Sequence, residues 1–240
     1  EALEPVEAGV EFEAPEVWLP FDLDEAGAAG FFRAWTRSSF WMPSDLRNAR
    51  VELRRLLLPA WIWDGQLESH WAGLIPAMTR SGKRPVSGQD SARFDGVLVP
   101  SSTALSRDEL SSISPFRLGP ARDVTDESPQ EPYEVGAVTR RGAHAEALAQ
   151  MKARHSTAIQ RQSGTVRIHI STLESEMEGR PLLLPVYIGA FRRNEKFYRV
   201  VMNGQSGAIA AESPVSWLKV LAAVAVVASL IFALLMVLTS

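Results

Sequence analysis

Hydrophobic residues form an uninterrupted run near the C-terminal end of the chain. Nineteen consecutive residues from Val220 to Leu238 carry no charge, and Ser229 is the only polar residue among them. As a helix with a rise of about 1.5 Å per residue, this run is roughly 28 Å long, close to the thickness of a bilayer's hydrocarbon core. The pattern predicts one transmembrane helix over residues 217–239, with a globular domain before it.

The N-terminal part of the chain mixes strand and helix patterns. Residues 1–16 are acidic and contain two prolines, which predicts a flexible arm. The elements expected after it are a strand at 17–21, a helix from Asp22 or Asp24 to about Arg37, and a short helix from Ser44 or Asp45 to about Arg50.

Apolar and aromatic residues crowd the next segment, which the turn dipeptide Asp64-Gly65 divides. This pattern predicts a β-hairpin with strands near 54–63 and 66–75. The elements expected next are a polar loop at 80–93, a strand at 94–100, and a brief helix near 107–113 that begins with the capping box Ser106-x-x-Glu109.

Proline and charge concentrate at 119–132, which predicts a linker between a first lobe at 17–118 and a second lobe at 133–212. The elements expected in the second lobe are a helix at about 142–162, a strand at 165–173, and strands near 182–192 and 196–203 joined at Asn194-Glu195. The predicted fold is therefore α+β: antiparallel β-hairpins with flanking helices, followed by one C-terminal transmembrane helix.

Two segments of the chain echo each other. LLLPAWIWDGQ begins at Leu56, and LLLPVYIGAFRR begins at Leu182. The echo predicts an internal duplication, in which two related hairpins pair into one antiparallel sheet or pack as two similar lobes. The alternative is that Leu-Leu-Leu-Pro followed by an aromatic residue is simply a common way to begin a strand.

Charge and composition exclude several functions. The net charge is −3 and the pI is about 5.9, so no basic field indicates a nucleic-acid partner. The chain has no cysteine, which excludes disulfides, thiolate metal sites and thiol catalysis. Lys219 beside the predicted span favours a cytoplasmic globular domain by the positive-inside rule.

The chain resembles a family of bacterial membrane proteins that carry an N-terminal zinc ribbon and are often mislabelled as primosomal or helicase-like. The matching blocks are VWLPFDLDEAGAAGFFRAW at 17–35, FWMPSDL at 40–46, LLLPAWIWDGQ at 56–66, FDGVLVPSSTAL at 94–105 and LLLPVYIGAFRRNEKFYRVVMNGQSGAIAAESPVSW at 182–217. The resemblance implies a single-pass protein of the bacterial inner (cytoplasmic) membrane with scaffold partners of the SPFH or phage-shock type.

The chain differs from that family in one large way: it contains no cysteine and therefore no zinc ribbon. The zinc binding that the family implies does not extend to this sequence. The helicase label is not supported either, because the dipeptide Gly82-Lys83 lacks the other residues of a phosphate-binding loop.

No catalytic, cofactor-binding or metal-ligating set emerges from the sequence. His144 and His155 are eleven residues apart, which does not match the i,i+4 spacing of a helical zinc site. We interpret the alternating acidic residues as a solvated loop rather than a cation site; they are Glu174, Glu176 and Glu178. No GxSxG nucleophile motif is present. We therefore expect a protein that is not an enzyme and has no cofactor.

Two groups of residues are predicted to work at the membrane. The predicted lipid-interface residues are Arg192, Arg193, Lys196, Trp217 and Lys219, which suit anionic head groups and the interfacial aromatic position. The predicted helix-packing residues are Ala222, Ala225, Ser229 and Ala233, which allow close helix approach. The alternatives are a solvated hairpin tip and an alanine-rich span without a partner.

The leading hypothesis is a non-enzymatic, membrane-anchored accessory or scaffold subunit whose helix packs into or beside a larger integral complex, such as a bioenergetic one. The alternatives are a membrane-stress adaptor, or a membrane-tethered ligand-binding or enzymatic domain. The last of these requires His70, His169 or the acidic residues to meet in a pocket.

Overall fold

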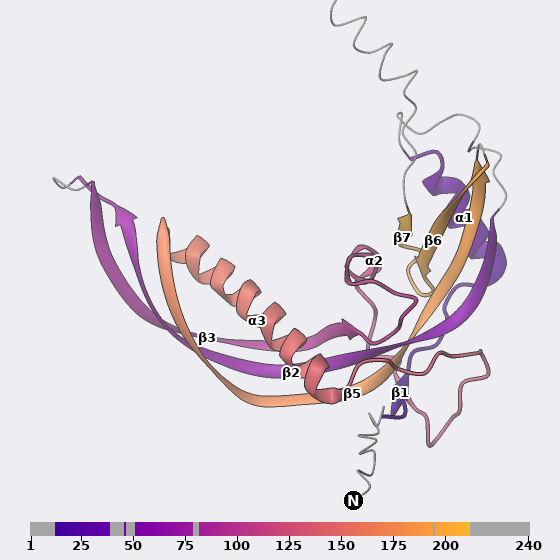
Figure 1. Ribbon diagram of the computed structural model, residues 1–240, viewed down its shortest axis with the longest axis horizontal. Helices are drawn as coiled ribbons and strands as arrows, with labels where there is room; N and C mark the ends of the chain where they lie inside the picture. The colour runs from indigo at the N-terminus through magenta and orange to yellow at the C-terminus, as the bar shows by residue number, and fades with distance from the viewer. Residues whose placement is uncertain (1–12, 39–45, 47–50, 79–81, 194, 212–240) are drawn as a thin grey trace, which may run out of the picture. The chain divides into compact units, whose positions relative to one another are not determined.

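The structure is a computed structural model that describes residues 13–38, 46, 51–78, 82–193 and 195–211 (Figure 1). Within these ranges the chain forms helices and a mixed seven-stranded sheet, which confirms the α+β class. The helices are α1 (Glu25–Trp35), α2 (Arg107–Ile113) and α3 (Arg140–Ser163). The strands are β1 (Val17–Trp18), β2 (Glu52–Pro76), β3 (Lys83–Pro100), β4 (Arg122–Asp123), β5 (Arg167–Arg193), β6 (Lys196–Asn203) and β7 (Ile209–Ala211).

The helices begin where the sequence places their caps. The Asp24 carboxylate accepts a hydrogen bond from the Gly27 amide at the start of α1, at 2.7 Å. Ser106 and Glu109 form the expected capping box at α2, because each side chain accepts from the other residue's backbone N–H. Gly164 ends α3 in the left-handed conformation with φ of 66°. The predicted helices after Asp24, at 107–113 and at 142–162 are confirmed.

The predicted hairpin turn at Asp64-Gly65 is wrong, because β2 continues through it. The β2–β3 register shifts between Trp63 and Gly65, so the dipeptide forms a bulge. The Asp64 carboxylate accepts a hydrogen bond from the Gly96 amide on β3 at 2.6 Å. Gly65 is also closely packed, since a Cβ there would lie 2.3 Å from the Met177 sulfur.

The predicted polar loop at 80–93 is wrong from Lys83 onward, because these residues form β3 and pair with β2 up to Pro76. Its polarity reflects an exposed sheet face rather than a loop: the odd-numbered residues from 83 to 95 are exposed and the even-numbered ones from 86 to 94 are partly covered. The strands expected at 165–173 and 182–192 are likewise parts of one strand, β5. Glu176 interrupts it with a φ of 52°.

The strands β2 and β5, which carry the two echoing segments, are neighbours in the sheet. The Val166 amide donates to the Leu74 carbonyl, and the Ser69 and Thr172 hydroxyls are 2.9 Å apart, so the two strands run antiparallel there. The hairpin β5–β6 confirms the expected reversal at 194–195, with Arg193 paired to Lys196.

The chain divides into two compact units drawn from interleaved segments. The first unit comprises Glu1–Pro20, Leu56–Ser111 and Arg117–Pro185, and the second comprises Phe21–Arg55, Ser112–Phe116 and Val186–Ser240. The segment expected as a linker, 119–132, contains β4, which pairs with β1 in the first unit.

In the first unit, α3 covers one face of β2 and β3 (Figure 1). Ala143, Ala147 and Met151 on the helix pack against Trp61, Trp63, Leu67, Val97 and Val99 on the strands, and all of them are buried. The helix residues recur every four positions, so one stripe of small and flexible side chains faces the sheet.

In the second unit, α1 packs on the hairpin β5–β6. The shared core consists of Ala28, Phe32, Leu46, Tyr187, Phe191, Val200 and Met202. The buried Asn203 side chain donates to the carbonyls of Ile113 and Pro115 at 2.8 and 3.2 Å, which ties the segment after α2 to the end of β6.

The two units are built in the same way. Trp61 Nε1 donates to the Val138 carbonyl at 3.0 Å, and the Tyr187 hydroxyl donates to the Leu23 carbonyl at 2.8 Å. Each acceptor immediately precedes a helix N-cap, Thr139 or Asp24, and each aromatic residue stands two positions after the proline of a Leu-Leu-Leu-Pro segment. Each unit thus combines a hairpin from one half of the chain with a helix from the other half.

Several predictions lie outside the described residues: the transmembrane helix at 217–239, most of the acidic arm and, apart from Leu46, the helix expected near 44–50. Among the residues that are described, no helix is both long and apolar enough to cross a membrane.

We expect Tyr187→Phe to lower the free energy of unfolding by about 1–2 kcal/mol, because it leaves the Leu23 carbonyl without this buried donor. Urea denaturation measures the change. Tyr198→Phe is the matched control, because Tyr198 stacks on Phe191 and is half-buried. Removal of its hydroxyl should lower the free energy of unfolding by less than about 0.5 kcal/mol. Equal losses in the two variants would contradict the anchoring role of Tyr187.

Candidate functional site

Two cations and an exposed aromatic ring lie at the tip of the β5–β6 hairpin. Arg192 and Lys196 are exposed, and Phe197 is 73 % exposed. Arg192 pairs with Phe197 across the hairpin, and its guanidinium carbon lies 5.9 Å from the phenyl centroid. The predicted interface residue Arg193 pairs with Lys196 through the backbone. Arg192 and Phe197 therefore share one face of the hairpin, and Lys196 lies at the same end on the opposite face.

The strand period decides which aromatic residue faces outward. Phe191 is buried and stacks on Tyr198, with ring centroids 5.2 Å apart. Because successive side chains on a strand point to opposite faces, burial of Tyr198 directs its neighbour Phe197 away from the core. The sequence prediction missed Phe197. The adjacent aromatic pair Phe197-Tyr198 was the available signal, since only one of the two can face the core.

Strand β7 directs the chain toward this hairpin tip. Ile209 pairs with Met202 and Ala211 pairs with Val200, so the chain leaves β7 in the direction of Lys196. Lys196 lies four residues along β6 from Val200, about 13 Å at a strand's rise. The six residue steps from Ala211 to Trp217 span at most about 22 Å. The sequence that follows β7 is thus long enough for Trp217 to reach the level of the tip.

The other predicted membrane residues, Trp217, Lys219, Ala222, Ala225, Ser229 and Ala233, lie outside the described residues. Their roles at lipid and at a helix interface stay predictions.

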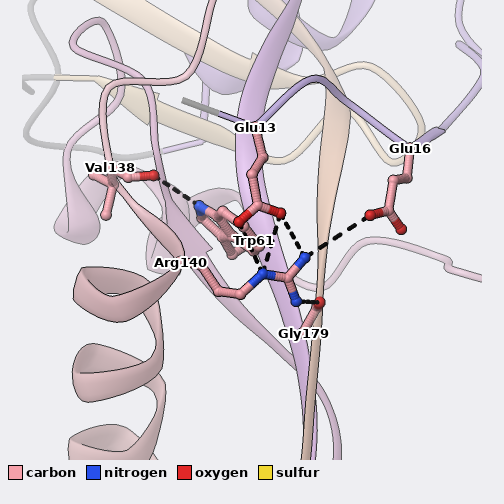
Figure 2. Close-up of polar contacts among 6 residues, drawn as sticks. All are labelled: Glu13, Glu16, Trp61, Val138, Arg140 and Gly179. Carbon is pink, nitrogen blue, oxygen red and sulfur yellow. Dashed lines mark hydrogen bonds and ion pairs between the residues drawn. The ribbon is translucent and has the colours of Figure 1, made fainter. Parts of the chain in front are cut away.

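A second polar cluster, centred on Arg140, belongs to the first unit (Figure 2). Arg140 donates from Nε to Glu13 Oε1 at 2.8 Å and from Nη1 to the Gly179 carbonyl at 2.7 Å. Its guanidinium also lies 5.1 Å from the Trp61 ring and 3.9 Å from Glu16. The hydrogen bond from Arg140 holds the pKa of Glu13 below its usual value.

The Arg140 cluster joins four parts of the unit: the segment at Glu13–Glu16, β2, the first turn of α3, and β5. Residues 13–16, the end of the acidic segment predicted as a flexible arm, are thus held in place, and the Glu16 amide adds a hydrogen bond to the Pro181 carbonyl. Because its donors are engaged by protein groups, Arg140 acts as a structural joint rather than as a ligand-binding cation.

Glu134 forms a comparable joint beside Ser102 and Thr103. Burial works to raise the pKa of Glu134, but hydrogen bonds from the Ser102 and Thr103 hydroxyls and the Thr103 amide outweigh it and leave that pKa lowered. Glu134 is therefore an ionised acceptor that fixes the turn after β3.

The histidines do not form a catalytic or metal-binding group in the described part of the chain. His70 Nδ1 lies 3.1 Å from Gln89 Nε2 in an open hollow of about 340 Å³. His144 packs edge-on against Trp63, and His155 is buried against Phe94. His169 is exposed on β5. No group of three or more potential metal ligands occurs among the described residues.

Comparison of the chain with known protein families, curated proteins and solved structures finds no match.

We expect Arg140→Lys to lower the free energy of unfolding by about 1 kcal/mol, because an ammonium cannot hold Glu13 and the Gly179 carbonyl as a guanidinium fork does. The largely exposed Glu13 pair is screened by solvent, which keeps the effect modest. The measurement is urea denaturation, with Arg141→Lys on the exposed side of the same helix turn as control. An effect no larger than that of the control would remove Arg140 from this structural role.

Proposed function

We propose that this protein is a non-enzymatic, membrane-anchored accessory subunit that holds protein partners at an anionic membrane surface, with the β5–β6 hairpin tip on the lipid. The observation that carries the proposal is the tip itself: Arg192 lies over the exposed Phe197, and Lys196 is at the same end of the hairpin, toward which β7 runs.

The chemistry of the tip suits a lipid head-group layer. Each Lys or Arg near an anionic leaflet contributes about 1 kcal/mol of attraction. An exposed phenyl ring beside Arg192 offers apolar surface at the depth where amphipathic segments insert. Trp217 and Lys219 extend the same interface in this proposal, and the span at 217–239 supplies the anchor.

The partners belong to the membrane as well. Ala222, Ala225, Ser229 and Ala233 form the face through which the span packs into or beside an integral complex, such as a bioenergetic one. SPFH or phage-shock scaffolds are the alternative partners, for a membrane-stress adaptor. The proposed location is the bacterial inner membrane, with the globular domain in the cytoplasm.

The repeated architecture supports an internal duplication as part of this proposal. Leu57 forms a parallel bridge to Tyr133, and Leu183 pairs in parallel with Trp18, so the two Leu-Leu-Leu-Pro segments receive equivalent neighbours. In a duplicated element, each copy contributes its hairpin to one unit and its helix to the other. Such a fold offers two similar platforms for protein partners on one chain.

Contact between the tip and lipid is tested with a fluorophore attached to a single introduced cysteine. The chain has no cysteine of its own, so no other residue needs to be replaced first. Phe197→Cys in the full chain is labelled with an environment-sensitive fluorophore and reconstituted into vesicles that contain anionic lipid and a lipid-borne quencher. We expect strong quenching, reduced at least about twofold by the further changes Arg192→Ser and Lys196→Ser, which remove the attraction of two cations.

The matched control probe is Glu25→Cys, an exposed position of α1 in the same unit. Quenching at position 25 equal to that at position 197 would contradict contact through the tip. Failure of the chain to remain in vesicles after alkaline carbonate extraction would instead contradict the membrane span.

Partner binding is tested by extracting native membranes with a mild detergent and following this chain by size. We expect it to migrate with a fixed set of integral subunits, and Ala225→Ile to disrupt this association because the larger side chain blocks close helix approach. Leu221→Ile, which conserves volume in the same span, is the control. Migration as a small monomer in the unmodified protein would exclude the subunit function.

A further inference from the structure

A pocket of about 390 Å³ opens in the first unit between the end of α3 and the hairpin β2–β3. It is lined by Trp71, Val86, Gln89, Asp90, Ile159, Gln162 and Ser163. Its volume is in the range of small-molecule sites, and its walls combine apolar side chains with a few polar groups. It is separate from the Arg140 cluster and from the β5–β6 tip, and the functions assigned above do not use it.

The charged side chain that lines the pocket is an acid, and the last turn of α3 also carries the exposed Arg161. Asp90 supplies the one charged side chain of its wall, and no hydrogen-bond donor or cation of the described residues contacts that carboxylate. Asp90 pairs with Ser69 on the face of the sheet that α3 covers, where it is only partly exposed. Ile159, Gln162 and Ser163 belong to the last turn of α3, whose carbonyl end carries negative helix-dipole potential.

Trp71 supplies a rigid aromatic wall. Its indole ring lies directly on Gly88 of the neighbouring strand, where an added Cβ would come within 2.6 Å of the ring. Glycine at that position therefore lets the indole lie close to β3, and Trp71 and Asp90 line the same pocket. An indole face next to a carboxylate attracts an organic cation through cation–π and ionic contacts together.

We infer that this pocket binds an organic cation, an ammonium group on a short apolar stem, with Asp90 as the ion partner and Trp71 as the aromatic wall. The apolar stem packs on Val86 and Ile159, and the amide group of Gln162 supplies a further polar contact. A lysine side chain of a partner protein and a free amine share this chemistry. The inference does not depend on membrane contact through the β5–β6 tip.

The test uses the full chain in a nonionic detergent, with its seven tryptophans replaced by 5-fluorotryptophan and followed by fluorine NMR. Trp71→Phe assigns the Trp71 signal, and the remaining signals serve as internal controls. The probes are phenethylammonium and its neutral analogue 2-phenylethanol. We expect phenethylammonium to shift the Trp71 signal with an affinity about tenfold higher than that of the alcohol, the ratio that one cation–π contact and one ion pair supply.

A second pair of probes identifies the source of the ammonium group. The peptide Ac-Ala-Lys-Ala-NH2 is compared with the same peptide acetylated at the lysine Nζ. Tighter binding of the unmodified peptide than of phenethylammonium assigns the pocket to a partner's lysine, and the reverse order assigns it to a free amine. Either result supports the inference.

Asp90→Asn should abolish the preference for the ammonium over the alcohol, whereas Glu68→Gln, which removes an exposed carboxylate from the opposite face of β2, should preserve it. Equal affinity of the cationic and neutral probes in the unmodified protein would overturn the inference. An undiminished preference in Asp90→Asn would do the same.

Discussion

Each unit of this protein depends on a hydrogen bond from a buried aromatic side chain to the backbone just before a helix. Trp61 reaches the Val138 carbonyl across 77 residues of sequence, and Tyr187 reaches the Leu23 carbonyl across 164. A buried carbonyl without a partner costs about 1–3 kcal/mol, so these contacts fix where each helix begins relative to its strand. Each hairpin is therefore covered by a helix from the other half of the chain, and the fold is interleaved.

The long strands are made possible by local irregularities rather than by uniform pleating. At Asp64 the register of β2 and β3 shifts, and the carboxylate binds the Gly96 amide in place of a regular ladder contact. Gly96 adopts a φ of 69° and Glu176 a φ of 52°. Such bulges re-aim a strand without ending it, so a segment that contains turn residues continues as a strand when its neighbours supply hydrogen bonds.

The two proposed sites share one physical property: each contains a side chain whose placement does not stabilise the fold. Phe197 exposes an apolar ring beside Arg192, and Asp90 keeps a carboxylate unpaired on the side of the sheet that α3 covers. Departures from local folding rules are expected at functional positions, because the benefit of such a residue lies in an intermolecular contact. By contrast, Arg140 and Glu134 have their charges engaged within the fold, and their chemistry serves stability.

The local features of this fold, such as helix caps and chain reversals, could be predicted from the sequence alone. The caps at Asp24 and Ser106 and the reversal before Lys196 depend on a few adjacent residues, so they were predictable. The sequence also predicted that Arg192 and Lys196 flank one hairpin turn. Only tertiary structure decided that β2 passes through Asp64-Gly65, that polar β3 is a strand, that Phe197 faces outward, and that Asp90 meets Trp71 at the end of α3. Those features depend on pairing and packing between residues far apart in the chain, which local propensity does not encode.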